Sequence, residues 1–250
     1  MRRLADATGN VYLRDSAERL AAKVAANVAG PPSPRAVIEV LDDPSRRAIT
    51  SRTQLAQVVL EALDGLAEDY GRDRGLRRRL WERQRDGTRW SDAWVPAEET
   101  RVSQELKAEL GTRLRGRVAV AREVEIQPAL GPDSADQPDL LVVALTTDTA
   151  TLDLPLEVKG NYNDDVVDAL TTQLADRYLT GPAGSEGIYV VAYFPLESWS
   201  KADANRRRIA ARYPLAPLRQ ALTDQATAEA HRGKTVHVRV IEVPLGNDDR

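Results

Sequence analysis

Three charged residues lie in or beside two short apolar segments, and their types and spacing could support hydrolytic chemistry. Asp139 is the second residue of the segment 138–145, and Glu157 and Lys159 lie in the segment 152–160. Both segments are bounded by turn-forming residues and read as strands, which predicts a hairpin. Side chains alternate between the faces of a strand, so Glu157 and Lys159 share one face and the apolar residues occupy the other. If Asp139 lies beside the end of the second strand, two carboxylates and one ammonium converge.

This combination suits a divalent metal ion next to a cation. Carboxylate oxygens are ligands that Mg²⁺ takes, and the ion keeps several waters because it dehydrates reluctantly. Metal binding lowers the pKa of a bound water, and a neighbouring ammonium stabilises charge on a phosphate oxygen. The residues therefore favour Mg²⁺-dependent hydrolysis of a phosphodiester, with Mn²⁺ as a substitute. The alternative is that Asp139 and Glu157 are strand-end acids that point into water.

The sequence Pro138-Asp139, followed by Glu157-x-Lys159, resembles the PD-(D/E)xK nuclease superfamily, which has the restriction-endonuclease-like fold. The resemblance implies an α/β fold with a mixed sheet core of the order αβββαβ, flanked by helices. It also implies a metal ion on Asp139 and Glu157, with Val158 contributing its backbone carbonyl. Lys159 would then assist the attacking water.

Two predicted helices flank these strands and supply further candidates. The helix after Pro96 carries an apolar stripe, with Glu109 inside the stripe and Glu105 on its edge. The resemblance implies that one acid of this helix joins the metal site. Either glutamate could do so, and Glu109 is the candidate ligand. A surface salt bridge is the alternative for both. On the helix after residue 160, Gln173 is a catalytic candidate and Arg177 a nucleic-acid contact, because several branches of the superfamily carry Gln or Arg there. The alternative is a hydrogen bond on the flank of that helix.

The chain divides into two predicted parts. Residues 1–95 lack strand patterns and read as a helical region, in which Ser51 begins a helix with an apolar stripe. Residues 96–250 read as the nuclease-like domain, which we expect to fold and act by itself. Besides the two segments above, its predicted strands cover residues 117–126, 187–194 and 235–243.

An arginine-rich stretch lies between residues 71 and 89, and it includes Arg77, Arg78 and Arg79. Guanidinium groups form paired hydrogen bonds with phosphate, so these three residues are candidate nucleic-acid contacts. A solvated helix face with ion pairs between neighbouring turns is the alternative.

The composition excludes several classes of protein. The 250 residues are 42% hydrophobic, which is ample for a core, and the net charge of −3 says little about partners. Because the chain has no cysteine, disulfides, zinc ribbons and thiol nucleophiles are excluded. His231 and His237 are its only histidines, which gives little support to a Ser-His triad. No apolar run is long enough to span a membrane, so we expect a cytoplasmic protein with no membrane partner.

Together these observations favour a Mg²⁺-dependent nuclease that acts on DNA, with RNA left open. Several segments, including Leu-Glu-Val-Lys-Gly, resemble nuclease domains of bacterial defence proteins. That resemblance implies a role in phage defence beside a sensor or helical partner protein; a homodimer is a further expectation. The competing hypothesis is a catalytically silent nucleic-acid-binding or structural module with the same fold.

Overall fold

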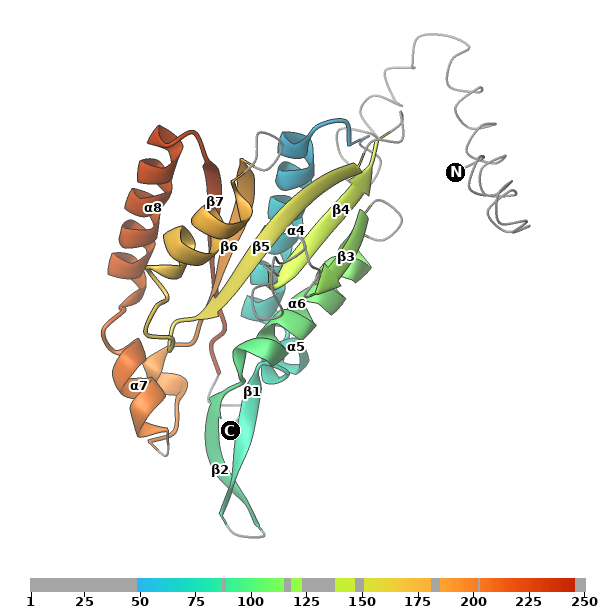
Figure 1. The fold of residues 1–250 in the computed structure, drawn as a ribbon. Helices are drawn as coiled ribbons and strands as arrows, with labels where there is room; N and C mark the ends of the chain where they lie inside the picture. The colour runs from blue at the N-terminus through green and yellow to red at the C-terminus, as the bar shows by residue number, and fades with distance from the viewer. Residues whose placement is uncertain are drawn as a thin grey trace, which may run out of the picture. The chain divides into compact units, whose positions relative to one another are not determined.

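A five-stranded mixed sheet forms the centre of the computed structural model, which describes residues 49–86, 89–114, 118–122, 138–146, 151–180, 185–201 and 203–245. The strands lie in the order β3-β4-β5-β6-β7. β3, β4 and β5 run antiparallel to one another, whereas β5, β6 and β7 run parallel (Figure 1). The strand bounds are Val118–Arg122 for β3, Leu140–Leu145 for β4, Thr151–Gly160 for β5, Glu186–Tyr193 for β6 and Thr235–Glu242 for β7.

Helices cover both faces of this sheet, because its central strands are apolar on both sides. On β6, Ile188 and Val190 belong to the core shared with α4 and α6, whereas Tyr189 and Val191 belong to a second core shared with η2 and α8. Figure 1 shows α4 and α6 behind the sheet, with η2 in front of it. The helix bounds are Arg52–Arg72 for α4, Arg74–Arg78 for α5, Glu99–Arg113 for α6, Leu170–Tyr178 for the π-helix η2, Leu196–Ser198 for the 3-10 turn η3, Ala204–Ala210 for α7 and Leu215–His231 for α8.

The mixed α/β architecture agrees with the sequence-based expectation. Along the chain, α6 is followed by β3, β4, β5, η2 and β6, and β7 completes the sheet. The stripe predicted after Pro96 is buried at Val102, Leu106 and Leu110. Of the predicted strand 117–126, residues 118–122 are β3 and the others lie outside the described residues. No helix in the described part of the chain has the length and apolarity needed to cross a membrane.

The helix predicted to begin at Ser51 is α4. The Ser51 side chain accepts a hydrogen bond from the backbone N–H of Gln54, as an N-cap does. At the other end, Asp73 accepts hydrogen bonds from the N–H groups of Gly75 and Leu76, which closes α4 and starts α5. The part of the predicted helical region that precedes residue 49 lies outside the described residues.

The region predicted to be entirely helical contains a pair of antiparallel strands, so the helical prediction is wrong for residues 81–86 and 89–95. β1 (Trp81–Asp86) pairs antiparallel with β2 (Arg89–Pro96), and the hairpin extends beyond the sheet in Figure 1. Trp81 anchors its base: the indole Nε1 donates to the carbonyl of Val243 at 3.3 Å, and the ring packs edge-on against Phe194. The pair Asp86-Gly87 favours a hairpin turn, but the surrounding arginines conceal the alternation of the strands.

The core extends across the boundary predicted between residues 95 and 96. Leu55, Leu63 and Leu66 of α4 are buried in the same cluster as Leu140 of β4 and Leu154 of β5. α4 also contacts β6 and β7. Residues before 96 therefore complete one face of the sheet.

A fragment that begins at residue 96 is expected to unfold without a cooperative transition, whereas residues 49–245 keep one. Burial of one leucine-sized side chain is worth about 1.5–3 kcal/mol. Loss of α4 exposes several such side chains, and their combined contribution is comparable to the total stability of a domain, about 5–15 kcal/mol. Urea unfolding followed by circular dichroism measures the difference. A sharp transition from the shorter fragment would support an independent domain beginning at residue 96.

Candidate functional site

The β4–β5 hairpin places Asp139 beside β5. Leu140 pairs with Leu156 in the antiparallel register, so the next residues outward, Asp139 and Glu157, come level with each other. Asp139 Oδ2 accepts a hydrogen bond from the backbone N–H of Val158 at 2.8 Å. The predicted proximity of Asp139 to the end of the second strand is therefore confirmed.

Glu157 and Lys159 form a buried ion pair on one face of β5. Lys159 Nζ lies 2.9 Å from Glu157 Oε1, and the two residues are 8% and 4% exposed. Their strand partners on β6 are Tyr189 and Val191, on the face covered by η2 and α8. Glu157 is therefore buried and paired, which does not match the alternative of a strand-end glutamate that points into water. Burying a charge is costly even when it is paired.

Burial and the neighbouring charges shift the pKa values of the acids and the lysine at this site. Burial and then repulsion from Asp139 raise the pKa of Glu157 to about 7, although Lys159 acts in the opposite direction. Burial by itself would lower the pKa of Lys159, but attraction to Glu157 and Glu99 outweighs it and raises that pKa. Burial also raises the pKa of Glu99. Glu157, Glu99 and Asp139 thus all act on the Lys159 ammonium.

Glu99, which was not predicted, is the α6 acid that reaches this site. Its Oε1 accepts hydrogen bonds from Gly160 N and from Asn163 Nδ2, both at 2.9 Å, and its Oε2 lies 3.8 Å from Lys159 Nζ. Glu99 stands three residues before Val102 and so extends the buried stripe of α6 by one turn. That periodicity is the sequence signal that selects the face of α6 on which Glu99 lies.

The two glutamates proposed from sequence point elsewhere. Glu109 pairs with Arg79 at 3.3 Å, and Glu105 lies 3.7 Å from the same guanidinium. Glu109 follows Glu99 by ten residues, which corresponds to about 15 Å along a helix at 1.5 Å per residue. The salt bridge considered as the alternative for these glutamates is what the structure contains.

Replacing Glu99 by alanine is expected to lower the free energy of unfolding by about 1–3 kcal/mol, because the Gly160 N–H and the Asn163 amide lose their shared acceptor. The matched change Glu109→Ala removes a half-exposed ion pair and should cost less than about 1 kcal/mol. Urea denaturation of both variants measures the contrast. Equal losses would show that Glu99 does not fix the end of β5.

The turn after β5 is held tightly against its surroundings. Asn161 is buried and exchanges hydrogen bonds with the backbone of Phe194 through both ends of its amide. Tyr162 donates from its hydroxyl to the carbonyl of Ala97 at 2.6 Å. A Cβ atom at Gly160 would lie 2.4 Å from the Tyr162 ring, so glycine is required at this close approach. These contacts fix the position of Lys159, one residue upstream.

Gln173 and Arg177 lie on η2. Gln173 Nε2 donates to Asp165 Oδ2 at 2.9 Å, which is the helix-flank hydrogen bond considered as its alternative. Arg177 is exposed. The 3.6-residue periodicity used to read this segment does not apply to a π-helix, in which residue i bonds to residue i+5.

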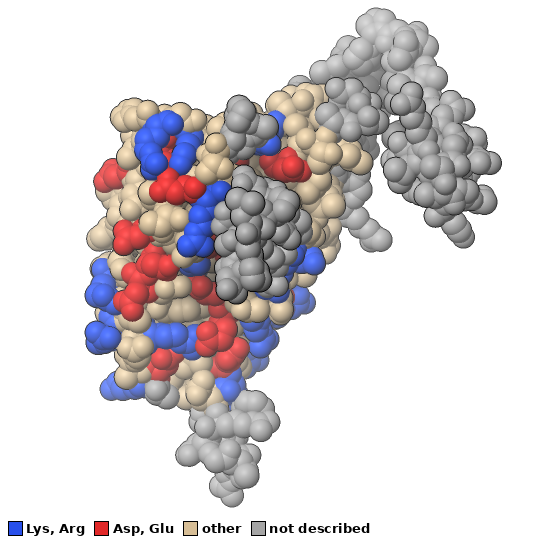
Figure 2. Space-filling view, viewed as in Figure 1, with Lys and Arg blue, Asp and Glu red and all other residues tan. Residues whose placement is uncertain are grey.

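The three candidate arginines near residue 78 all have contacts within the protein. Arg77 Nη1 donates to the carbonyl of Gly71 at 3.0 Å, at the end of α4. The Arg78 guanidinium lies 4.9 Å from the centroid of the Trp94 ring, and Arg79 contacts the α6 glutamates. On the face drawn in Figure 2, basic and acidic side chains of the described residues are interspersed.

The donor set fits a hydrated divalent cation better than a fully protein-coordinated one. Among the described residues, no group of three or more His, Cys, Asp or Glu side chains could hold a metal ion. Asp139 and Glu157 with the Val158 carbonyl would leave the remaining positions to water, as is usual for Mg²⁺. A cation would relieve the repulsion between Asp139 and Glu157, which is a physical reason for one to bind there.

Comparison with known proteins adds no assignment. No protein-family model, curated protein or solved structure matches the chain. The function is therefore argued from the geometry of Asp139, Glu157, Lys159 and Glu99.

Proposed function

We propose that the protein is a Mg²⁺-dependent nuclease that hydrolyses phosphodiester bonds of DNA. The observation that carries this proposal is the buried pair Glu157–Lys159 with Asp139 beside it, at adjoining positions of β4 and β5. Burying these charges costs stability. A catalytic role would explain why an otherwise apolar sheet contains them. The restriction-endonuclease-like fold is part of the proposal, and the chain order α6-β3-β4-β5-η2-β6 supports it.

Each residue has a distinct proposed role. Asp139, Glu157 and the carbonyl of Val158 would hold the metal ion. When bound, Mg²⁺ or Mn²⁺ supplies a water of lowered pKa and neutralises charge on the phosphate. Lys159 is held by Glu157 and Glu99, and its ammonium would stabilise the negative charge that develops on a phosphate oxygen. Glu99 is a positioning residue for Lys159.

The biological setting of this proposal follows from the resemblance to nuclease domains of bacterial defence proteins. It comprises phage defence in the cytoplasm, beside a sensor or helical partner protein or a second copy of the chain. Gln173 and Arg177 retain proposed roles at the scissile phosphate only if the substrate reaches η2.

A silent structural or nucleic-acid-binding module is the second candidate, and one observation favours it. The Lys159 ammonium already has two carboxylate partners, and it connects β5 to α6 through them. A purely structural ion pair would look the same in a protein that performs no chemistry. Turnover decides between the two candidates.

The test of the nuclease proposal is incubation with plasmid, linear duplex, single-stranded DNA and RNA, each in Mg²⁺, Mn²⁺ or EDTA. We expect cleavage of at least one DNA substrate in Mg²⁺ and none in EDTA. Binding without cleavage in every metal would favour the silent module. Cleavage that persists in EDTA would contradict a role for the metal.

If Arg77, Arg78 and Arg79 contact phosphates, changing them together to glutamine weakens DNA binding at every sequence. The slope of log affinity against log salt concentration would become shallower by up to about 0.9 for each lost contact with duplex DNA. Fluorescence anisotropy over a salt series measures the slope. An unchanged slope would assign these arginines to the protein contacts described above alone.

A further inference from the structure

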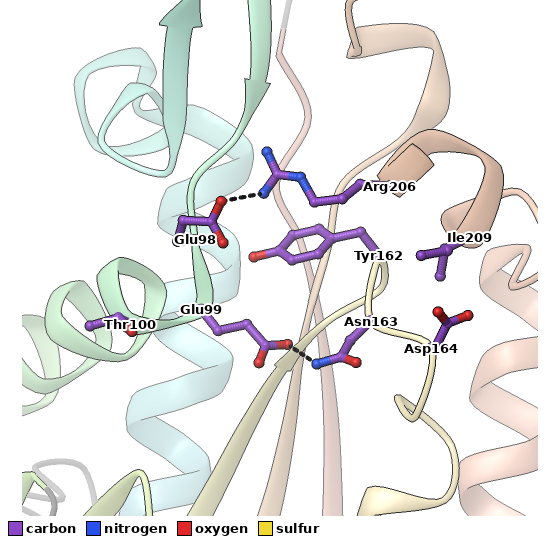
Figure 3. Close-up of a pocket in the computed structure, with 8 residues that line it drawn as sticks. All are labelled: Glu98, Glu99, Thr100, Tyr162, Asn163, Asp164, Arg206 and Ile209. Carbon is purple, nitrogen blue, oxygen red and sulfur yellow. Dashed lines mark hydrogen bonds and ion pairs between the residues drawn. The ribbon is translucent and has the colours of Figure 1, made fainter. Parts of the chain in front are cut away.

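A pocket of about 400 Å³ opens beside Glu99 (Figure 3). It lies among the start of α6, the turn after β5 and α7. This volume falls within the range of about 300–1,000 Å³ that is usual for small-molecule sites, and one nucleotide fits such a space. Its lining residues are Glu98, Glu99, Thr100, Tyr162, Asn163, Asp164, Arg206 and Ile209.

Arg206 and Tyr162 form a cation-π pair at this pocket. The Arg206 guanidinium lies 4.9 Å from the centroid of the Tyr162 ring. Two carboxylates fix it in place: Asp203 bonds to its Nε, and Glu98 lies 3.3 Å from its Nη1. The Tyr162 ring is fixed in turn by its hydroxyl contact with the Ala97 carbonyl. Unstacked bases pack on aromatic rings and on guanidinium planes of this kind.

The other polar groups of the pocket are mainly hydrogen-bond acceptors. Glu98 and Asp164 are exposed carboxylates, and Glu99 presents a third carboxylate below them in Figure 3. Ionised carboxylates accept hydrogen bonds and repel phosphate. A ligand that combines a flat ring with an amino group therefore suits this pocket better than a phosphate does. Cytosine, adenine and guanine have such an amino group, whereas thymine and uracil do not.

Glu99 connects this pocket to the candidate catalytic residues. It lines the pocket, and its Oε2 lies 3.8 Å from Lys159 Nζ. A strand with a phosphate at Lys159 would therefore bring a neighbouring nucleotide to the pocket. A base held in a duplex cannot enter, because its ring faces are stacked and its amino group is paired.

We propose that the pocket takes one unpaired, amino-bearing base of the nucleic-acid strand, next to the phosphate that is cleaved. The inference rests on the proposed nuclease function and deepens it, because it names single-stranded or locally opened nucleic acid as the substrate class. Arg206 stacks on the base, and Glu98 accepts a hydrogen bond from its amino group.

The test measures binding of short oligo-dC and oligo-dT by fluorescence anisotropy in Mg²⁺. The full chain carries Asp139→Asn, so that the oligonucleotides stay intact, and gel electrophoresis verifies this. Arg206→Lys keeps the charge but removes the plane, and should weaken oligo-dC binding about tenfold, as loss of a stacking partner does. Arg208→Lys is the matched control, because Arg208 is exposed on the same helix and does not line the pocket.

A second variant tests the Glu98 carboxylate while Asp203 still holds Arg206 over Tyr162. Glu98→Gln should reduce the preference for oligo-dC over oligo-dT about five- to tenfold, whatever its effect on total affinity. Glu68→Gln is its control, since Glu68 is also an exposed carboxylate paired with an arginine, on α4.

The outcomes separate this inference from the nuclease proposal. Equal effects of Arg206→Lys and Arg208→Lys, an unchanged preference in Glu98→Gln, or no binding of either oligonucleotide would overturn the pocket even if the wild type cleaves DNA. Binding that depends on Arg206 and Glu98 would support the pocket even if the wild type cleaves nothing, and in that case only the nuclease proposal fails.

Discussion

Substituting methionine for Lys159 is expected to lower the single-turnover rate of DNA cleavage by about 10²–10³, the loss typical of removing one electrostatic stabiliser. The ammonium is held 2.9 Å from Glu157 in a buried environment, where its interaction strengthens as charge develops on the phosphate. Affinity for DNA should change much less than the rate. Rapid-quench cleavage and anisotropy binding measure the two quantities on the same preparation.

Loss of Lys159 also has a structural cost that the experiment has to separate. The change leaves Glu157 and Glu99 without their shared cation, and removal of one partner from a buried pair costs about 3–5 kcal/mol. Lys159→Arg keeps the charge and is the variant to use if the methionine variant unfolds; it should retain the fold with a reduced rate. Lys107→Met, on the exposed side of α6, is the control. A methionine variant that binds less tightly but cleaves at the wild-type rate would place Lys159 in binding alone.

The second large effect concerns the carboxylates. Asp139→Asn and Glu157→Gln each remove a proposed metal ligand with little change in side-chain volume. Loss of a residue that only supports a ligand reduces activity about 10- to 100-fold, so loss of a ligand should reduce cleavage by more than about 100-fold. In EDTA, Asp139→Asn should be no less stable through charge, because it removes a carboxylate that repels Glu157. Glu157→Gln breaks the buried pair with Lys159 and is expected to lower the free energy of unfolding by about 3–5 kcal/mol.

Metal-dependent stability gives the same prediction a readout other than activity. A ligand that binds only the folded state stabilises it by about 2.7 kcal/mol at 100 times its dissociation constant. Mg²⁺ should therefore raise the melting temperature of the wild type and leave the melting temperatures of both variants nearly unchanged. Asp153→Asn, an exposed change on β5, should respond like the wild type. A Mg²⁺ response that survives in both variants would place the ion elsewhere.

The sequence predicted the arrangement of Asp139, Glu157 and Lys159 because it depends on local structure. The two strands of one hairpin are close in the chain, and alternation along β5 alone puts Glu157 and Lys159 on the same face. No knowledge of the rest of the molecule was needed. The predicted apolar stripes of α4 and α6 were recovered for the same reason.

The position of Glu99 could not be predicted in the same way, because it depends on how α6 packs on the sheet. Its contacts with Gly160 and Lys159 join residues about 60 positions apart, so helix periodicity selects a face but not the turn that meets β5. The base of the β1–β2 hairpin likewise depends on a distant partner, since Trp81 packs against Phe194. Tertiary contacts determine the positions of both Glu99 and Trp81.

The most direct measurement of the central claim compares purified wild type and Asp139→Asn side by side on the same DNA, in Mg²⁺ and in EDTA. Preparing both proteins identically separates the activity of this chain from that of a contaminating nuclease. The account predicts cleavage only by the wild type in Mg²⁺, with Asp139→Asn reduced by more than about 100-fold and equally well folded. Equal cleavage by the two proteins, or none by either in any metal, would contradict it.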